Sequence, residues 1–300
     1  MSAVAVALLV ESAGAYWDIS YHSLNEVDTF FQPAHMLIYS GAAGALAFGL
    51  VMAVVHKVKR FAILSAVILA AGYADMQWHE TFGFDGLLSP VHVALMGATA
   101  GQAVAVFRMA STARAKTFAL SAVWLSFAFA LFMFSLPASK TEAFDFNPPA
   151  LFTLGLGIVA FPLLSLLVMG QAKANGIRPV IVTAIYTGII SIATLAFNPH
   201  VSWIVPLFLL NVAGAYAIER WEVAKLFAGA GWLLTYAPFS AFVVGYGLYG
   251  QVAGVEQFTD MAIKTQWAIP LMVSAGGLVG LLLSVRTGLA SKSFCSIVRR

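Results

Sequence analysis

The sequence predicts an all-α polytopic membrane protein, and three observations support this prediction. Of the 300 residues, 61% are hydrophobic and 10% are charged, and the mean hydropathy is +0.88. A water-soluble domain does not hide so much apolar surface. Apolar stretches of about 20 residues, the length of a helix that crosses a bilayer, recur along the whole chain. The short alternating segments of a membrane β-barrel are missing from the sequence.

About ten membrane-spanning helices are expected. Proline stands at or near the start of several of these spans, where it is tolerated because the first-turn N–H groups of a helix have no helical partner. The connections between spans are short and leave no room for a separate soluble domain. The expected spans are residues 2–21, 33–55, 61–79, 91–109, 117–136, 149–169, 179–197, 201–218, 226–249 and 267–285.

The distribution of charge predicts the topology. If the N-terminus is cytoplasmic, every lysine and arginine except Lys140 and Lys264 falls on the cytoplasmic side, as the positive-inside rule requires. Both termini are therefore expected in the cytoplasm, and the chain is expected in the cytoplasmic (plasma) membrane, surrounded by the lipid bilayer. The apolar N-terminal segment lacks the basic residues of a secretory signal, so we expect it to be retained as the first helix.

Several classes of site are missing from the sequence. It contains no glycine-rich nucleotide-binding loop, no Ser/His/Asp arrangement and no basic patch for nucleic acid, so we expect no nucleic-acid partner. Cys295 is the single cysteine, which excludes an internal disulfide and a cysteine-based metal site.

An internal repeat occupies the N-terminal part of the chain. The segment "DISYHSLNEVDTFFQPAH", residues 18–35, aligns without a gap with "DMQWHETFGFDGLLSPVH", residues 75–92, at an offset of 57. Each repeat unit, about 10–57 and about 67–114, is expected to form a helix, an outer loop and a returning helix. The two units run in the same direction, unlike the inverted repeats of many transporters. The predicted regions are the duplicated hairpins, 1–116, and additional transmembrane helices of unknown role, 117–300.

Each repeat unit presents an aspartate and two histidines. Asp18 and His22 are separated by four residues and share a helix face, and His35 follows Pro33 in the first turn of the next helix. A short hairpin brings these three side chains toward one point on the extracytoplasmic side. Imidazole and carboxylate ligands with open coordination positions suit copper, zinc or non-haem iron. The equivalent set in the second unit is Asp75, His79 and His92.

The alternative is that the aspartates and histidines satisfy one another across helix interfaces. Ionisable groups in membrane spans are costly and usually functional, and their repetition in register favours metal binding. Glu11 falls near the same helix face as Asp18 and is interpreted as a proton relay, as a partner behind the ligands or as a polar contact between helices. Asp28 and Asp85, in the outer loops, either orient a ligand histidine or cap a turn.

The first segment resembles the C subunit of the copper-containing membrane monooxygenases, the methane and ammonia monooxygenase family. The resemblance covers roughly residues 10 to 110. In this family an Asp-x3-His-x12-His set binds copper within the membrane. The second segment looks like the second ligand set of the family but has Asp75 where the family has asparagine. The matching residues are Asp18, His22, Asp28, Thr29, Phe31, Pro33 and His35 in the first segment, and Trp78, His79, Pro90 and His92 in the second.

The resemblance implies a copper-binding component of a membrane monooxygenase, which catalyses oxygen-dependent oxidation of a small substrate. It also implies other monooxygenase-type subunits as partners, and a homo-oligomer is the other expectation. If the chain is enzymatic, the metal site is expected to be the catalytic centre. One alternative is a non-catalytic protein for copper or zinc storage, delivery or transport. Another is a structural or quinol-linked subunit whose aspartates and histidines move protons.

Overall fold

The structure, a computed structural model, consists of two compact units, Met1–Pro149 and Ala150–Arg300. All regular structure in the described part is helical. The described residues are 1–23, 29–56, 58–82, 89–133, 164–165, 167–197, 205, 212–213, 215–216 and 219–220.

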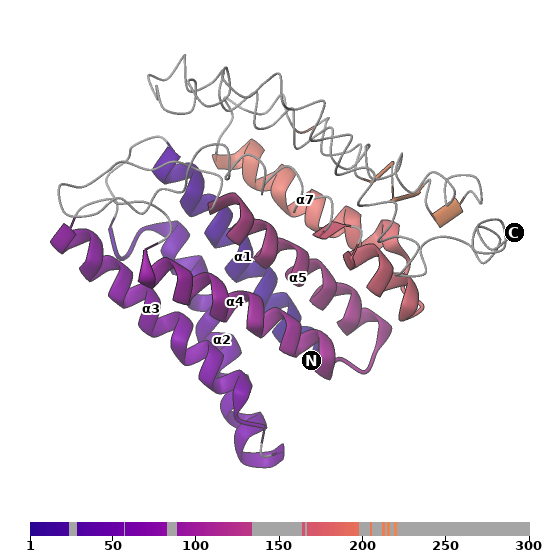
Figure 1. The fold of residues 1–300 in the computed structure, drawn as a ribbon, viewed down its shortest axis with the longest axis horizontal. Helices are drawn as coiled ribbons and strands as arrows, with labels where there is room; N and C mark the ends of the chain where they lie inside the picture. The colour runs from indigo at the N-terminus through magenta and orange to yellow at the C-terminus, as the bar shows by residue number, and fades with distance from the viewer. Residues whose placement is uncertain are drawn as a thin grey trace, which may run out of the picture. The chain divides into compact units, whose positions relative to one another are not determined.

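Five long helices make up the described part of the first unit, and a sixth labelled helix belongs to the second unit (Figure 1). The observed bounds agree with the corresponding predicted spans to within about four residues. The other predicted spans, 149–169, 201–218, 226–249 and 267–285, lie wholly or mostly outside the described residues. The helices are α1 Ser2–Ser23, α2 Pro33–His56, α3 Arg60–Phe82, α4 Pro90–Met109, α5 Ala113–Met133 and α7 Pro179–Phe197.

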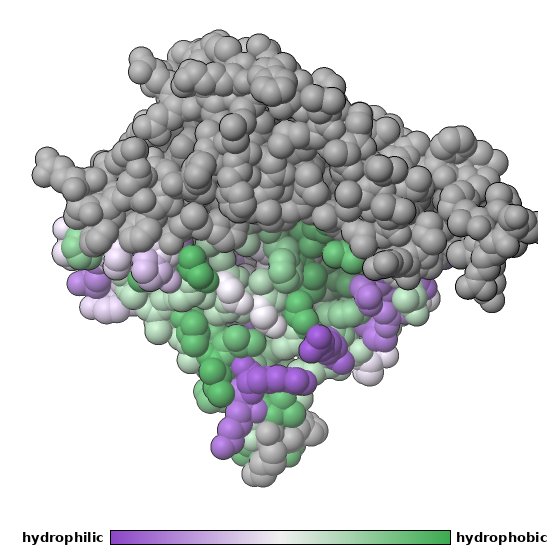
Figure 2. All heavy atoms as spheres, viewed as in Figure 1, coloured by the Kyte–Doolittle hydropathy of each residue, from purple (hydrophilic) through white to green (hydrophobic). Residues whose placement is uncertain are grey.

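Membrane character is evident in the described helices. Three of them, α2, α3 and α4, are long and apolar enough to cross a membrane. Large apolar side chains stand exposed on α2 and α3, and hydrophobic residues dominate much of the described surface that Figure 2 shows. Hydrocarbon, unlike water, accepts such a surface without cost. The most exposed of these α2 and α3 side chains include Leu50, Val51, Val54, Val55 and Ile63.

The helices of the first unit close into a ring. Each helix from α1 to α5 contacts the next, and α5 contacts α1 in turn. The contact between α1 and α2 is close because both contribute glycines. A Cβ at Gly14 would lie 2.8 Å from the Ile38 nitrogen, and one at Gly41 would lie 2.7 Å from the Ala7 oxygen. Such close backbone approach is typical of helices that pack within membranes.

The sequence predicts duplicated hairpins in residues 1–116 and additional helices in residues 117–300. In the structure α5, which follows that boundary, packs against α1 and α4 and completes the ring that holds the duplicated hairpins. Helix α5 therefore packs with the repeat.

In the second unit a carboxylate fixes the start of α7. Glu219 accepts hydrogen bonds from the Arg178 Nε at 2.6 Å and from the Val180 backbone N–H at 3.3 Å. A negative charge at a helix N-terminus is favourable because the first-turn N–H groups point toward it. Gly176, with a φ of +69°, ends the preceding helical segment in the left-handed conformation that glycine adopts readily.

Candidate metal centre

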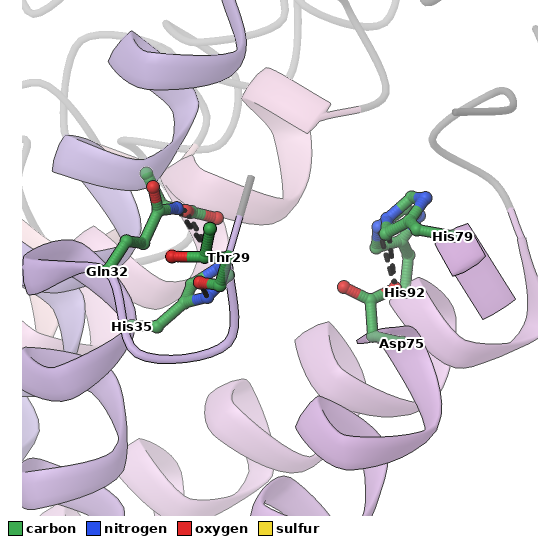
Figure 3. Close-up of polar contacts among 7 residues, drawn as sticks. Thr29, Gln32, His35, Asp75, His79 and His92 are labelled. Carbon is green, nitrogen blue, oxygen red and sulfur yellow. Dashed lines mark hydrogen bonds and ion pairs between the residues drawn. The ribbon is translucent and has the colours of Figure 1, made fainter. Parts of the chain in front are cut away.

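The second copy of the repeat brings its three predicted ligands together. Asp75 and His79 occupy adjacent turns near the end of α3, and His92 occupies the first turn of α4 (Figure 3). One ligand atom from each residue lies within 4.8 Å of the other two. In this copy Asp75 and His79 of one helix therefore meet His92 of the next helix, as predicted.

Distances within this cluster place both imidazoles against one carboxylate oxygen. The Asp75 Oδ1 lies 3.0 Å from the His92 Nε2 and 3.5 Å from the His79 Nε2. The two imidazole rings lie 5.4 Å apart, centroid to centroid. The His92 side chain is only 6% exposed, so water does not solvate this part of the cluster freely.

Ser89 orients the His92 ring. It is the residue before Pro90 and caps α4, because its Oγ accepts a hydrogen bond from the His92 backbone N–H at 3.4 Å. The same oxygen lies 2.8 Å from the His92 Nδ1. When Nδ1 donates its proton to Ser89, the lone pair of Nε2 is directed toward Asp75, which is the tautomer that a metal ligand needs.

These residues fit a transition metal ion. The Asp75 Oδ1 is buried and has no hydrogen-bond partner, even though two imidazole nitrogens lie close to it. Ligand atoms about 2.1 Å from a tetrahedral ion lie roughly 3.4 Å from one another, which is close to both distances between the Asp75 Oδ1 and an imidazole nitrogen. A shared cation would satisfy the orphaned oxygen and both nitrogens at once.

The first copy has a different arrangement. The Asp18 Oδ1 lies 3.0 Å from the His35 Nε2, as predicted. The same carboxylate oxygen also accepts a hydrogen bond from the Gln32 Nε2 at 2.8 Å, and that amide nitrogen lies 3.4 Å from the His35 Nε2. The His35 Nδ1 lies 3.0 Å from the Thr29 carbonyl oxygen, an acceptor that fixes its proton on Nδ1. Figure 3 shows this cluster and the second-copy cluster as two separate groups.

Gln32 and Ser89 contact the two clusters, although the sequence did not single them out. They occupy equivalent positions in the repeat, each directly before a proline that begins a helix. Residues at this position cap the helix and stand beside its first turn, where the ligand histidine also stands. Their place before Pro33 and Pro90 is the signal that identifies them.

Three of the predicted site residues lie where their side chains are not described. His22 belongs to α1, but its side chain lies outside the described residues, as do Asp28 and Asp85 entirely. The predicted contributions of these three side chains therefore stay predictions.

Glu11 is buried inside the helical ring. It is 2% exposed, and its Oε1 accepts a hydrogen bond from the Thr99 Oγ1 of α4 at 3.1 Å. Of the roles that the sequence suggests for Glu11, the polar contact between helices is the one that this bond demonstrates.

Comparisons of the chain with models of protein families, with curated proteins and with solved structures found no match. The fold and site define a class: over its described residues the chain is helical, with helices long and apolar enough to cross a membrane, and it holds a partly buried Asp/His/His cluster that suits a metal ion.

Proposed function

We propose that this protein binds copper in the membrane through Asp75, His79 and His92, as a component of an oxygen-dependent oxidation of a small substrate. The observation that carries the proposal is the convergence of three ligand atoms within 4.8 Å around a buried carboxylate oxygen that has no hydrogen bond. Two imidazoles and one carboxylate also bind zinc or non-haem iron, so these metals are the alternatives in the experiment below.

Each residue of the cluster has a separate task in this proposal. Asp75 supplies an anionic oxygen that offsets part of the charge of the ion, while His79 and His92 supply neutral nitrogen ligands. Ser89 holds the His92 ring in the ligand tautomer through its contact with Nδ1. A bound copper ion would supply one-electron redox chemistry, and the surrounding helices would keep bulk water away.

The resemblance to the C subunit of the membrane monooxygenases supports the oxidation chemistry. The second-copy cluster differs from the family in having Asp75 in place of asparagine, which adds one negative charge to the ligand set. Partner subunits of the monooxygenase type, or further copies of this chain, would complete such an enzyme.

The wider topology belongs to the proposal as well. Ten spans with both termini in the cytoplasm would place both clusters on the extracytoplasmic side of the plasma membrane. The asymmetry of the basic residues supports this orientation. Labelling of single cysteines at the two termini and in the 83–88 loop of intact cells tests it. The loop alone should react with an impermeant reagent, and reaction at either terminus would refute the proposed orientation.

Metal analysis of the purified full chain tests the binding step. The protein is loaded separately with copper, zinc and iron, dialysed, and assayed for bound metal per chain. We expect copper to be retained and a His79→Ala, His92→Ala double variant to lose one equivalent of it. Equal metal content in the folded wild type and folded double variant would refute the site, and would favour an interpretation in which Asp75 pairs only with a protonated histidine.

Oxygen uptake tests the catalytic step. Copper-dependent oxygen consumption with a small oxidisable substrate, measured in native membranes so that partner subunits are retained, is the expected result. Retained copper without such consumption would instead favour the storage, delivery or transport of metal.

A further inference from the structure

Glu11 is a buried carboxyl group that the proposed metal centre does not use. Its Oε1 accepts the hydrogen bond from Thr99, whereas its Oε2 is buried and has no hydrogen-bond partner. The backbone of α2 covers it closely, since a Cβ on Gly41 would lie 2.8 Å from the Glu11 Cβ. The side chain is therefore buried and has one neutral hydrogen-bond partner.

The repeat shows that packing alone does not require a polar pair at this position. Glu11 and Thr99 correspond, at the offset of 57, to Ile68 and Ala42 of the other copies. Ile68 and Ala42 lie together in a buried apolar cluster with Ala98. The same pair of repeat positions is thus filled by a carboxyl and a hydroxyl on one side of the ring and by hydrocarbon on the other.

No charge compensates Glu11 within the described residues. Thr99, which donates to it, and Gly41, which lies against it, do not titrate. At the contact of α1 with α5, the titratable group is Tyr16, whose hydroxyl donates to the Leu125 carbonyl oxygen. The other titratable groups of the packed helices stand mostly in the end turns, and they are His35, Tyr39 and His56 of α2, His92 and Arg108 of α4, and Arg114 and Lys116 of α5.

We propose that Glu11 and Thr99 form a proton-binding site inside the helical ring, with Glu11 carrying the proton. Burying an ionised carboxylate without a cation is unfavourable because it loses its hydration, and the neutral acid avoids this loss. The neutral acid also matches the observed bonding, because Thr99 donates to the carbonyl oxygen and the unpaired oxygen carries the acid proton.

The Glu11 and Thr99 site is separate from the Asp75 cluster. Thr99 follows His92 by seven residues on α4, which is about two helical turns or roughly 10.5 Å along the helix axis. The site therefore lies further into the ring than the Asp75 cluster does. The inference does not depend on metal binding, and its test uses protein without added metal.

Infrared difference spectroscopy of the purified full chain is the deciding measurement. At neutral pH, the spectrum of the wild type minus that of Glu11→Gln should contain one carbonyl band of a protonated carboxylic acid. Gln is nearly isosteric with the neutral acid and keeps an acceptor for Thr99, so the variant is expected to fold. A difference spectrum with carboxylate bands in place of the acid band would overturn the proposal.

Chemical labelling provides a second, independent measurement. Dicyclohexylcarbodiimide is apolar and adds to protonated carboxylic acids, forming a stable N-acylurea. Peptide mapping should locate an adduct on Glu11 and none on Asp75, whose carboxylate oxygen lies against two imidazole nitrogens. Loss of both the infrared band and the adduct in sodium chloride, compared with choline chloride, would show that Glu11 binds a metal cation and would also overturn the proton assignment.

Discussion

In the second copy of the repeat Asp75 faces two imidazole nitrogens, whereas in the first copy Asp18 accepts a hydrogen bond from the Gln32 amide. One contribution to the difference is the residue before the helix-starting proline. Ser89 is short, so its hydroxyl stays beside its own helix and holds His92. Gln32 is longer, and its amide reaches both the carboxylate and the imidazole of the first cluster.

This comparison teaches that a shared Asp/His/His pattern does not by itself produce two equal metal sites. An amide N–H cannot ligate a cation, and here it occupies an oxygen lone pair that a metal would otherwise use. The second cluster leaves its carboxylate oxygen without a hydrogen bond. We therefore expect the second cluster to bind metal more tightly than the first.

The largest effect is expected from His92→Ala. This change removes a buried ligand and leaves Asp75 and His79, two ligands from adjacent turns of one helix. Metal affinity of the second cluster should fall by at least about 100-fold, since an ion then loses a third of its protein ligands. Titration with copper, monitored by competition with a chelator, measures this. His56→Ala, at the far end of α2 from His35, is the matched control and should bind as the wild type does. Unchanged copper affinity in folded His92→Ala would contradict the site.

A smaller loss is expected from Ser89→Ala. Removing the hydroxyl should lower the metal affinity by about 10- to 100-fold, because it frees the His92 ring from its orienting partner. It should also lower the free energy of unfolding by about 1 kcal/mol through loss of the helix cap.

Thr112→Ala separates these two effects of Ser89. Thr112 Oγ1 accepts a hydrogen bond from the Ala115 N–H at 3.2 Å and so caps α5, away from either cluster. This control should lose a similar unfolding free energy and keep its metal affinity. If both variants bind metal equally well, Ser89 acts only as a cap.

Gly14→Ala should damage the first cluster selectively. The added Cβ would lie 2.8 Å from the Ile38 nitrogen and 2.9 Å from the Ala34 oxygen, so α1 and α2 must separate. A destabilisation of about 1–3 kcal/mol follows from such overpacking, and Asp18 should move away from His35. Gly97→Ala is the control, since nothing lies within 4 Å of its added Cβ. Chemical denaturation in detergent compares the two, and equal stability would contradict the observed α1–α2 packing.

The smallest effect is expected from Gln32→Ser. This change gives the first copy the serine that the second copy has at the equivalent position, Ser89. Loss of the amide donor frees the Asp18 oxygen, so metal affinity at the first cluster should rise several-fold. The measurement is copper binding in a His79→Ala, His92→Ala background, where the second cluster is silent. A decrease in affinity would mean that Gln32 supports the first cluster instead of competing with a metal.

Much of the fold and part of the site follow from sequence. The lengths of the apolar stretches locate the spans of α1 to α5 and α7, because a helix needs about 20 residues to cross a bilayer. Pro33 and Pro90 mark the starts of α2 and α4. The four-residue spacing of Asp75 and His79 fixes their shared face, and the repeat offset identifies the equivalent ligands. These features depend on positions close together in the chain, where local geometry decides the outcome.

Only the tertiary structure decided which polar groups of different helices meet. The approach of His92 to Asp75 and the bond between Thr99 and Glu11 each join two helices, and Gln32, directly before α2, reaches Asp18 of α1. Helix periodicity defines a face but leaves open the rotation of one helix against the next, which close glycine contacts and side-chain volumes set. Sequence therefore specified the helices and the ligand pattern, and packing determined that one copy leaves its carboxylate open while the other covers it with an amide.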